Sequence, residues 1–121
     1  MTNKSFAITM LPAPLLIEAN DGVLYVHNLV DPAHGEVPVY PGAAKGDAIT
    51  LTVSNSDGIN EWEGKEVLSS ATIEKPILFK IPKAPFEKML DAKKSAVLQY
   101  SVKHANGNQA ASFQTPIELK N

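Results

Sequence analysis

The sequence predicts one all-β domain, an antiparallel β-sandwich of roughly seven to eight short strands. Two observations predict this fold. Apolar and polar residues alternate with a period of two along several segments, which gives each predicted strand one buried and one solvated face. Turn-forming residues separate these segments every ~8–12 residues, a spacing typical of sandwiches. With 121 residues, 44% of them hydrophobic, the chain has the size and composition of a single compact domain, which we place over residues 1–121.

The clearest alternation occurs in segments that we predict as strands, namely residues 48–54, 77–81, 96–104 and 110–119. In the first of these, Ile49, Leu51 and Val53 point to one face and the intervening hydroxyl side chains point to the other. Pro116 in the last segment indicates an edge position or a bulge, because proline cannot donate a ladder hydrogen bond.

Shorter segments flanked by turn residues are predicted as the remaining strands, namely residues 15–17, 23–30 and 37–40 and the segment around Trp62. Turn chemistry such as Asn106-Gly107-Asn108 separates the predicted strands. One segment, residues 84–94, departs from the period of two. There Phe86, Met89 and Leu90 recur at positions i, i+3 and i+4, which predicts one short helical turn near Phe86 and Leu90.

Two aromatic residues favour an immunoglobulin-like sandwich. Tyr100 lies two residues before Val102, the relation that a tyrosine corner has to the second core cysteine of immunoglobulin domains. Val102 would replace that cysteine, Leu51 or Val53 would take the partner position, and Trp62 would be the core tryptophan of the next strand. Since the chain has no cysteine, this core would be disulfide-free. Simple filling of a sandwich core by Trp62 and Tyr100 is the alternative, and it is the usual outcome for aromatic residues.

Several short motifs carry a family resemblance, namely Asp31-Pro32 through Gly35, Val37-Pro38-Val39-Tyr40-Pro41-Gly42, Gly46-Asp47-Ala48-Ile49-Thr50-Leu51, Phe79-Lys80-Ile81-Pro82, Val97-Leu98-Gln99-Tyr100-Ser101-Val102, Gly107 and Ser112. In these motifs, from Pro12 to Leu119, the chain resembles the immunoglobulin-like repeats found in tandem in large bacterial surface and adhesin-like proteins. The resemblance implies a spacer or cell-adhesion module of a bacterial protein, with no chemistry of its own.

Composition excludes several classes of function. The absence of cysteine excludes disulfides, thiol catalysis and zinc–thiolate sites. The chain has no arginine and a formal net charge of -2, which makes it a poor nucleic-acid binder because guanidinium groups supply most bidentate contacts to phosphate and guanine. No segment approaches the ~18–20 apolar residues that span a bilayer, and we expect no membrane insertion. Pro12 and Pro14 interrupt the apolar run after Lys4, so the chain shows no ordinary secretory signal, and an extracellular or surface location is expected if it is a module of a larger protein.

Candidate catalytic groups are isolated in the sequence. The histidines are His27, His34 and His104, and no serine lies in a Gly-x-Ser-x-Gly elbow, so we expect no enzyme activity and no catalytic residue. Glu61 and Glu63 flank Trp62, and strand alternation places both carboxylates on the face opposite the indole. Lys65 shares that face, and a solvated, charge-balanced face is the expectation there.

Metal and cofactor sites are not expected either. Asp31, His34 and Glu36 lie close together in the sequence, but no repeated ligand spacing supports the group. Residues 55–61 resemble a calcium loop only faintly, because the alternating acids and the terminal bidentate glutamate are missing.

Binding through a surface is the remaining class of function. We predict a non-enzymatic binding or structural module acting in adhesion, spacing or protein–protein contact. The alternative is a small carbohydrate-binding sandwich that uses an end loop. The candidate ligand-binding residues of that loop are Asn55, Asp57, Asn60 and Glu61. The expected partner is a protein or a glycan, and the chain is expected to be a monomer or a weak homo-oligomer.

Overall fold

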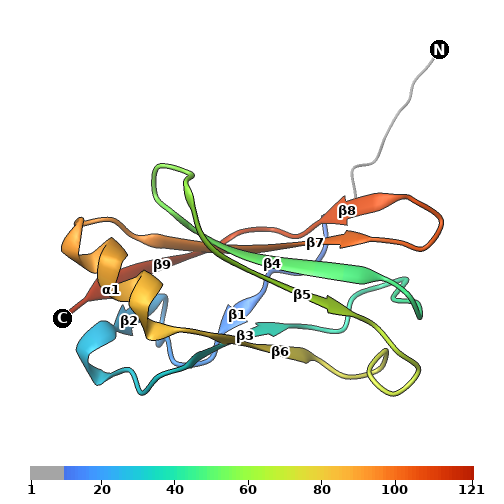
Figure 1. The fold of residues 1–121 in the computed structure, drawn as a ribbon, viewed down its shortest axis with the longest axis horizontal. Coiled ribbons are helices and arrows are strands. Elements are labelled where there is room, and N and C mark those ends of the chain that lie inside the picture. The colour runs from blue at the N-terminus through green and yellow to red at the C-terminus, as the bar shows by residue number, and fades with distance from the viewer. Residues whose placement is uncertain (1–9) are drawn as a thin grey trace, which may run out of the picture.

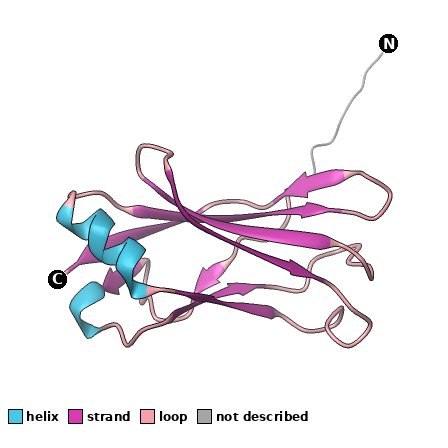
Figure 2. Cartoon of the chain, in the orientation of Figure 1, coloured by secondary structure: helices cyan, strands magenta, loops and turns pink. Residues whose placement is uncertain are grey.

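A computed structural model describes residues 10–121 and shows two β-sheets packed together, with helical segments at one end (Figures 1 and 2). In chain order the elements are β1 (Leu15–Leu16), β2 (Val23–Tyr25), the 3-10 turn η1 (Val26–Asn28), β3 (Ala33–Val37), β4 (Ala48–Asn55), β5 (Asn60–Val67), β6 (Ile77–Ile81), α1 (Lys83–Asp91), β7 (Ala96–Lys103), β8 (Gln109–Ala111) and β9 (Thr115–Lys120). The predicted all-β sandwich with one short helix is confirmed.

The sheets differ in size. The three-stranded sheet has the order β1-β3-β6, and the six-stranded sheet has the order β2-β9-β7-β4-β5, with β8 paired to β7. All named pairings are antiparallel except β2 with β9, which is parallel. Figure 1 shows the smaller sheet as the layer beneath β4 and β7, so the core lies between the two layers.

Buried and partly buried residues alternate along β4, which lies between β7 and β5 in the larger sheet. Ile49, Leu51 and Val53 are buried, as predicted, and the residues between them are only partly buried. In the ladder to β7, Leu51 lies opposite Tyr100 and Val53 lies opposite Leu98. Because paired residues share a face of the sheet, these side chains form one continuous buried layer.

Several predicted strand bounds are wrong, for local reasons. Predicted strand 23–30 stops at β2, because the chain turns into η1 to bury Val26. Predicted strand 110–119 is divided between β8 and β9. The predicted strand at residues 37–40 starts earlier, as β3, where Gly35 faces the core. A Cβ at Gly35 would lie 2.7 Å from Cδ2 of Leu51, so β3 and β4 approach closely there and a larger residue would displace that side chain.

The predicted helical turn is a full helix, α1. Its first amide, Lys83 N–H, donates to Oδ1 of Asp31 over 2.7 Å. This remote carboxylate replaces the missing side-chain cap at Pro82. Phe86 and Met89 are buried, and they pack the helix against the end of the sandwich.

The proposed arrangement of the immunoglobulin-like core residues is wrong. Val102 lies opposite Ile49 in the same sheet, so β4 cannot supply its partner from the facing sheet. Trp62 lies on β5, beside β4 in that sheet, and is only partly buried. Its indole covers Gly64, where a Cβ would be 2.5 Å from the ring. The indole therefore packs against the edge of the core from β5 and does not occupy its centre.

The predicted tyrosine corner is also wrong. Tyr100 is 1% exposed, and among residues 10–121 its hydroxyl has no hydrogen-bond partner. The ring of Tyr100 packs against Tyr40, with ring centroids 6.3 Å apart. Tyr100 therefore fills the core, which is the alternative that the sequence left open.

Candidate interaction surface

The predicted ligand loop forms the turn between β4 and β5, and its polar side chains bond to one another. Asn55 is buried, and its Oδ1 accepts the amides of Asp57 at 2.9 Å and Ile59 at 3.2 Å. Its Nδ2 donates to Oε2 of Glu61 at 3.0 Å. Asn60 accepts the amide of Trp62 through its own Oδ1 at 3.1 Å. The structure therefore brings Asn55, Asp57, Asn60 and Glu61 together, as the organisers of a turn.

Charged contacts bind this turn to the segment around α1. Glu61 accepts a hydrogen bond from Nζ of Lys88 at 3.0 Å, and Lys94 pairs with Asp57. The hydrogen bond from Lys88 lowers the pKa of Glu61. A register shift after Val53 moves Glu61 out of the regular ladder. The expectation that Glu61 shares the outward face of Glu63 is therefore wrong.

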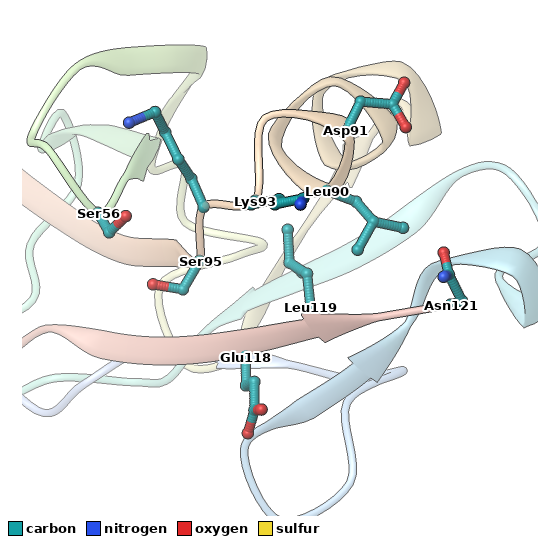
Figure 3. Close-up of a pocket in the computed structure, with 9 residues that line it drawn as sticks. Ser56, Leu90, Asp91, Lys93, Ser95, Glu118, Leu119 and Asn121 are labelled. Carbon is teal, nitrogen blue, oxygen red and sulfur yellow. The ribbon is translucent and has the colours of Figure 1, made fainter.

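An open cavity of about 670 Å³ lies beside this turn, and we call it the end cavity. Figure 3 shows Leu90 of α1 and Leu119 of β9 between the carboxylates of Asp91 and Glu118. Lys93 also lines it, and among residues 10–121 no aromatic side chain does. The end cavity therefore offers hydrogen-bonding groups of both charges without the aromatic platform that sugar sites usually add.

Two of the histidines are paired with carboxylates. Nδ1 of His34 lies 2.6 Å from Oε2 of Glu18, and the His34 amide donates to Oε1 of the same carboxylate at 2.8 Å. Nδ1 of His104 lies 3.0 Å from Oδ1 of the fully buried Asp47. Neither imidazole hydrogen-bonds a serine or threonine hydroxyl within residues 10–121. Sequence reasoning missed both pairs because the partners are 16 and 57 residues apart.

Asp47 is the centre of a buried polar network. The hydroxyl of Tyr40 donates to Oδ2 at 2.7 Å, and the amide of Ala44 donates to the same oxygen at 3.0 Å. Burial acts to raise the pKa of Asp47, but the hydrogen bonds from Tyr40, Ala44 and His104 outweigh it and lower that pKa. The ionised carboxylate thus joins the connection before β4 to the turn after β7.

Two of the metal candidates, Asp31 and His34, have other partners in the structure. Asp31 caps α1, and His34 pairs with Glu18. Within residues 10–121, no group of three or more His, Cys, Asp or Glu side chains could hold a metal ion. In the same residues, no helix is long and apolar enough to cross a membrane.

The outward side of the three-stranded sheet differs from an ordinary solvated face. We call it the outer face and define it by Leu15, Ile17, His34, Glu36, Leu78 and Lys80. Leu15, Ile17 and Leu78 are 54%, 50% and 56% exposed. Solvated faces of antiparallel sheets normally carry polar residues at such positions.

The other sheet shows the ordinary pattern. The outward residues of its central strands are mostly polar, namely Thr50, Thr52 and Ser54 on β4 and Gln99, Ser101 and Lys103 on β7. None of the large exposed hydrophobic side chains lies on either strand. The outward side of β4 and β7 therefore differs in chemistry from the outer face, which carries the large exposed side chains of Leu15, Ile17 and Leu78.

A cavity of about 540 Å³ continues the outer face beyond Ile17. Tyr25 and Val30 line it and are 46% and 82% exposed, and the Glu18–His34 pair lines it as well. The exposed apolar surface therefore extends from the sheet into a cavity with fixed polar groups. Contiguous apolar surface of this kind marks interaction sites.

Comparisons with protein-family models, with curated proteins and with solved structures found no match to this chain.

Proposed function

We propose that the chain is a non-enzymatic binding module that contacts protein partners through the outer face. The contrast between the two outward faces carries this proposal. Leu15, Ile17 and Leu78 each keep about half of their surface in water, and burial of apolar surface contributes ~25 cal/mol per Å². Burial of these side chains by a partner would therefore stabilise the complex.

The polar groups near the outer face support binding more than catalysis. The Glu18 carboxylate contacts Nδ1 of the His34 ring through Oε2 and accepts a hydrogen bond from the His34 backbone amide through Oε1. This holds the imidazole in one orientation, as a specific hydrogen-bonding group beside an apolar surface. The resemblance of the sequence to bacterial immunoglobulin-like repeats supports the same class of function, a contact or spacer module in adhesion.

The test is selection of binders from a phage-displayed random peptide library on immobilised protein. We expect selected peptides to bind wild type and to lose binding to Ile17→Ser and Leu78→Ser. Ile59→Ser is the matched control, because Ile59 is similarly exposed, at 59%, but lies in the β4–β5 turn. Peptides that bind the outer-face variants as well as wild type, or a selection with no specific binders, would refute this function.

A carbohydrate-binding module is the second candidate, and the end cavity supports it. Lys93, Ser95 and Asn121 line that cavity with hydrogen-bonding groups. We expect Lys93→Ala to weaken any glycan bound there, measured by titration of the best ligand from a glycan array. An array without hits contradicts this candidate and leaves the protein-binding proposal standing.

A further inference from the structure

We propose that the outer face pairs with the outer face of a second copy of this chain, forming a weak symmetric dimer. The inference rests on the proposed function and names its partner. A two-fold dimer requires a patch that is complementary to itself. The register of the three-stranded sheet provides such a patch.

The ladder arranges the outer face in two rows across the strands. In the first row Leu15 of β1 lies opposite Glu36 of β3, and Glu36 lies opposite Leu78 of β6. The central residue of this row is therefore an acid between two exposed leucines.

The second row is two residues away from the first on each strand, in the direction in which β1 and β6 run and opposite to that of β3. Ile17 donates its amide to the carbonyl of His34 at 2.9 Å, and His34 lies opposite Lys80. The central residue of this row is an imidazole, between an apolar and a basic side chain.

Two sheets packed face to face can be related by a two-fold axis that lies between them and runs across the strands. That operation places the first row of one copy on the second row of the other. Leu15 then meets Ile17 of the second copy, and Glu36 meets the imidazole of His34. Leu78 meets the aliphatic stem of Lys80. Each contact joins compatible chemistry, and each occurs twice.

A two-fold axis along the strands gives a different result. It would place the carboxylate of Glu36 against the same carboxylate of the second copy. Like charges directly opposed are unfavourable. Charge therefore selects the axis across the strands, which makes the proposed geometry specific.

The size of the face sets the strength of the dimer. Three strands ~4.8 Å apart and about five residues of ~3.4 Å each cover an area of roughly 14 by 17 Å. This is well below the ~800 Å² per partner that stable complexes bury. We therefore expect a reversible dimer that populates only at high protein concentration.

The experiment is sedimentation equilibrium of the full chain from about 10 μM to about 1 mM, a range suited to weak association. We expect the weight-average mass to rise from 13.0 kDa with concentration. Ile17→Ser should reduce the rise, whereas Ile59→Ser should leave it unchanged. A mass that stays at the monomer value throughout, or a rise that both variants leave equal, overturns the dimer.

Glu36→Gln tests the geometry through the sign of its effect. With the axis across the strands it removes the contact with His34 of the second copy, and the association constant should fall several-fold. With the axis along the strands it removes carboxylate repulsion, and the constant should rise. A rise refutes the proposed arrangement. A monomeric protein that still binds selected peptides through the outer face refutes the dimer alone and leaves the proposed function intact.

Discussion

Tyr100→Phe is expected to leave the free energy of unfolding unchanged or to increase it by roughly 1 kcal/mol. The hydroxyl of Tyr100 is buried and has no hydrogen-bond partner among residues 10–121. Burying an unpaired polar group costs about 1–3 kcal/mol. The substitution removes that group, and loss of the oxygen's packing contacts offsets part of the gain.

Tyr40→Phe is the matched control, because Tyr40 is also buried and its ring lies 6.3 Å from that of Tyr100. The same atom is removed there, but its hydroxyl donates to the ionised Asp47 at 2.7 Å. Hydrogen bonds to charged groups contribute about 1.5–3 kcal/mol. Tyr40→Phe should therefore destabilise the protein by about 2 kcal/mol, whereas Tyr100→Phe should not destabilise it.

Urea denaturation, followed by tryptophan fluorescence and circular dichroism, measures both variants. A constant slope m shows that the midpoint shift reports stability. A loss of 1 kcal/mol or more in Tyr100→Phe would refute the reasoning, because it would reveal a hydrogen bond of the kind that a tyrosine corner makes. An unchanged Tyr40→Phe would refute the importance of the Asp47 network.

Further predictions concern pH and the core. Burial raises the pKa of Tyr40, and it raises the pKa of Tyr100 to about 12. The free energy of unfolding should therefore stay constant up to about pH 10 and fall as pH rises from there through the pKa values of the folded state. Urea midpoints at alkaline pH measure this fall. The lowered pKa of Asp47 stabilises the fold at neutral pH, and this contribution should disappear as pH falls below about 4; Asp47→Asn should be less stable than wild type at pH 7 and should show a smaller difference in acid. Gly35→Ala should destabilise by about 1–3 kcal/mol, because its Cβ would lie 2.7 Å from Leu51, and Leu51→Val should recover part of the loss in a double-mutant cycle.

The strands with regular alternation could be predicted because their signal is local. Ile49, Leu51 and Val53 identify a buried face without reference to any other segment. The pairing of strands is not local, and alternation alone does not show that β4 and β7 lie side by side in one sheet, so the prediction that Leu51 or Val53 partners Val102 across the core is wrong. The bounds of β3 could not be predicted for a related reason. Gly35 faces the core but adds no apolar side chain to the alternation, and its small size matters only because Leu51 of the other sheet lies close to it.

The outer face could not be predicted from periodicity. Leu15, Leu16 and Ile17 are all apolar, so their alternation does not reveal which side chain is buried. On β6 the alternation is informative, because Ile77, Phe79 and Ile81 inward and Lys80 outward leave Leu78 on the outward side, as the structure shows. Only the register shows that Leu78 shares one face with Leu15 and Ile17.

The apolar character of the outer face is not explained by folding. A side chain that stays half exposed in the folded chain contributes only part of the ~1.5–3 kcal/mol that full burial provides. Threonine and lysine fill comparable outward positions on β4 and β7, and they keep a sheet surface solvated. Polar substitutions at Leu15, Ile17 and Leu78 should therefore lower stability little while removing most of the surface available to a partner. A large loss of association with a small loss of stability would show that these side chains act in binding and not in packing of the core.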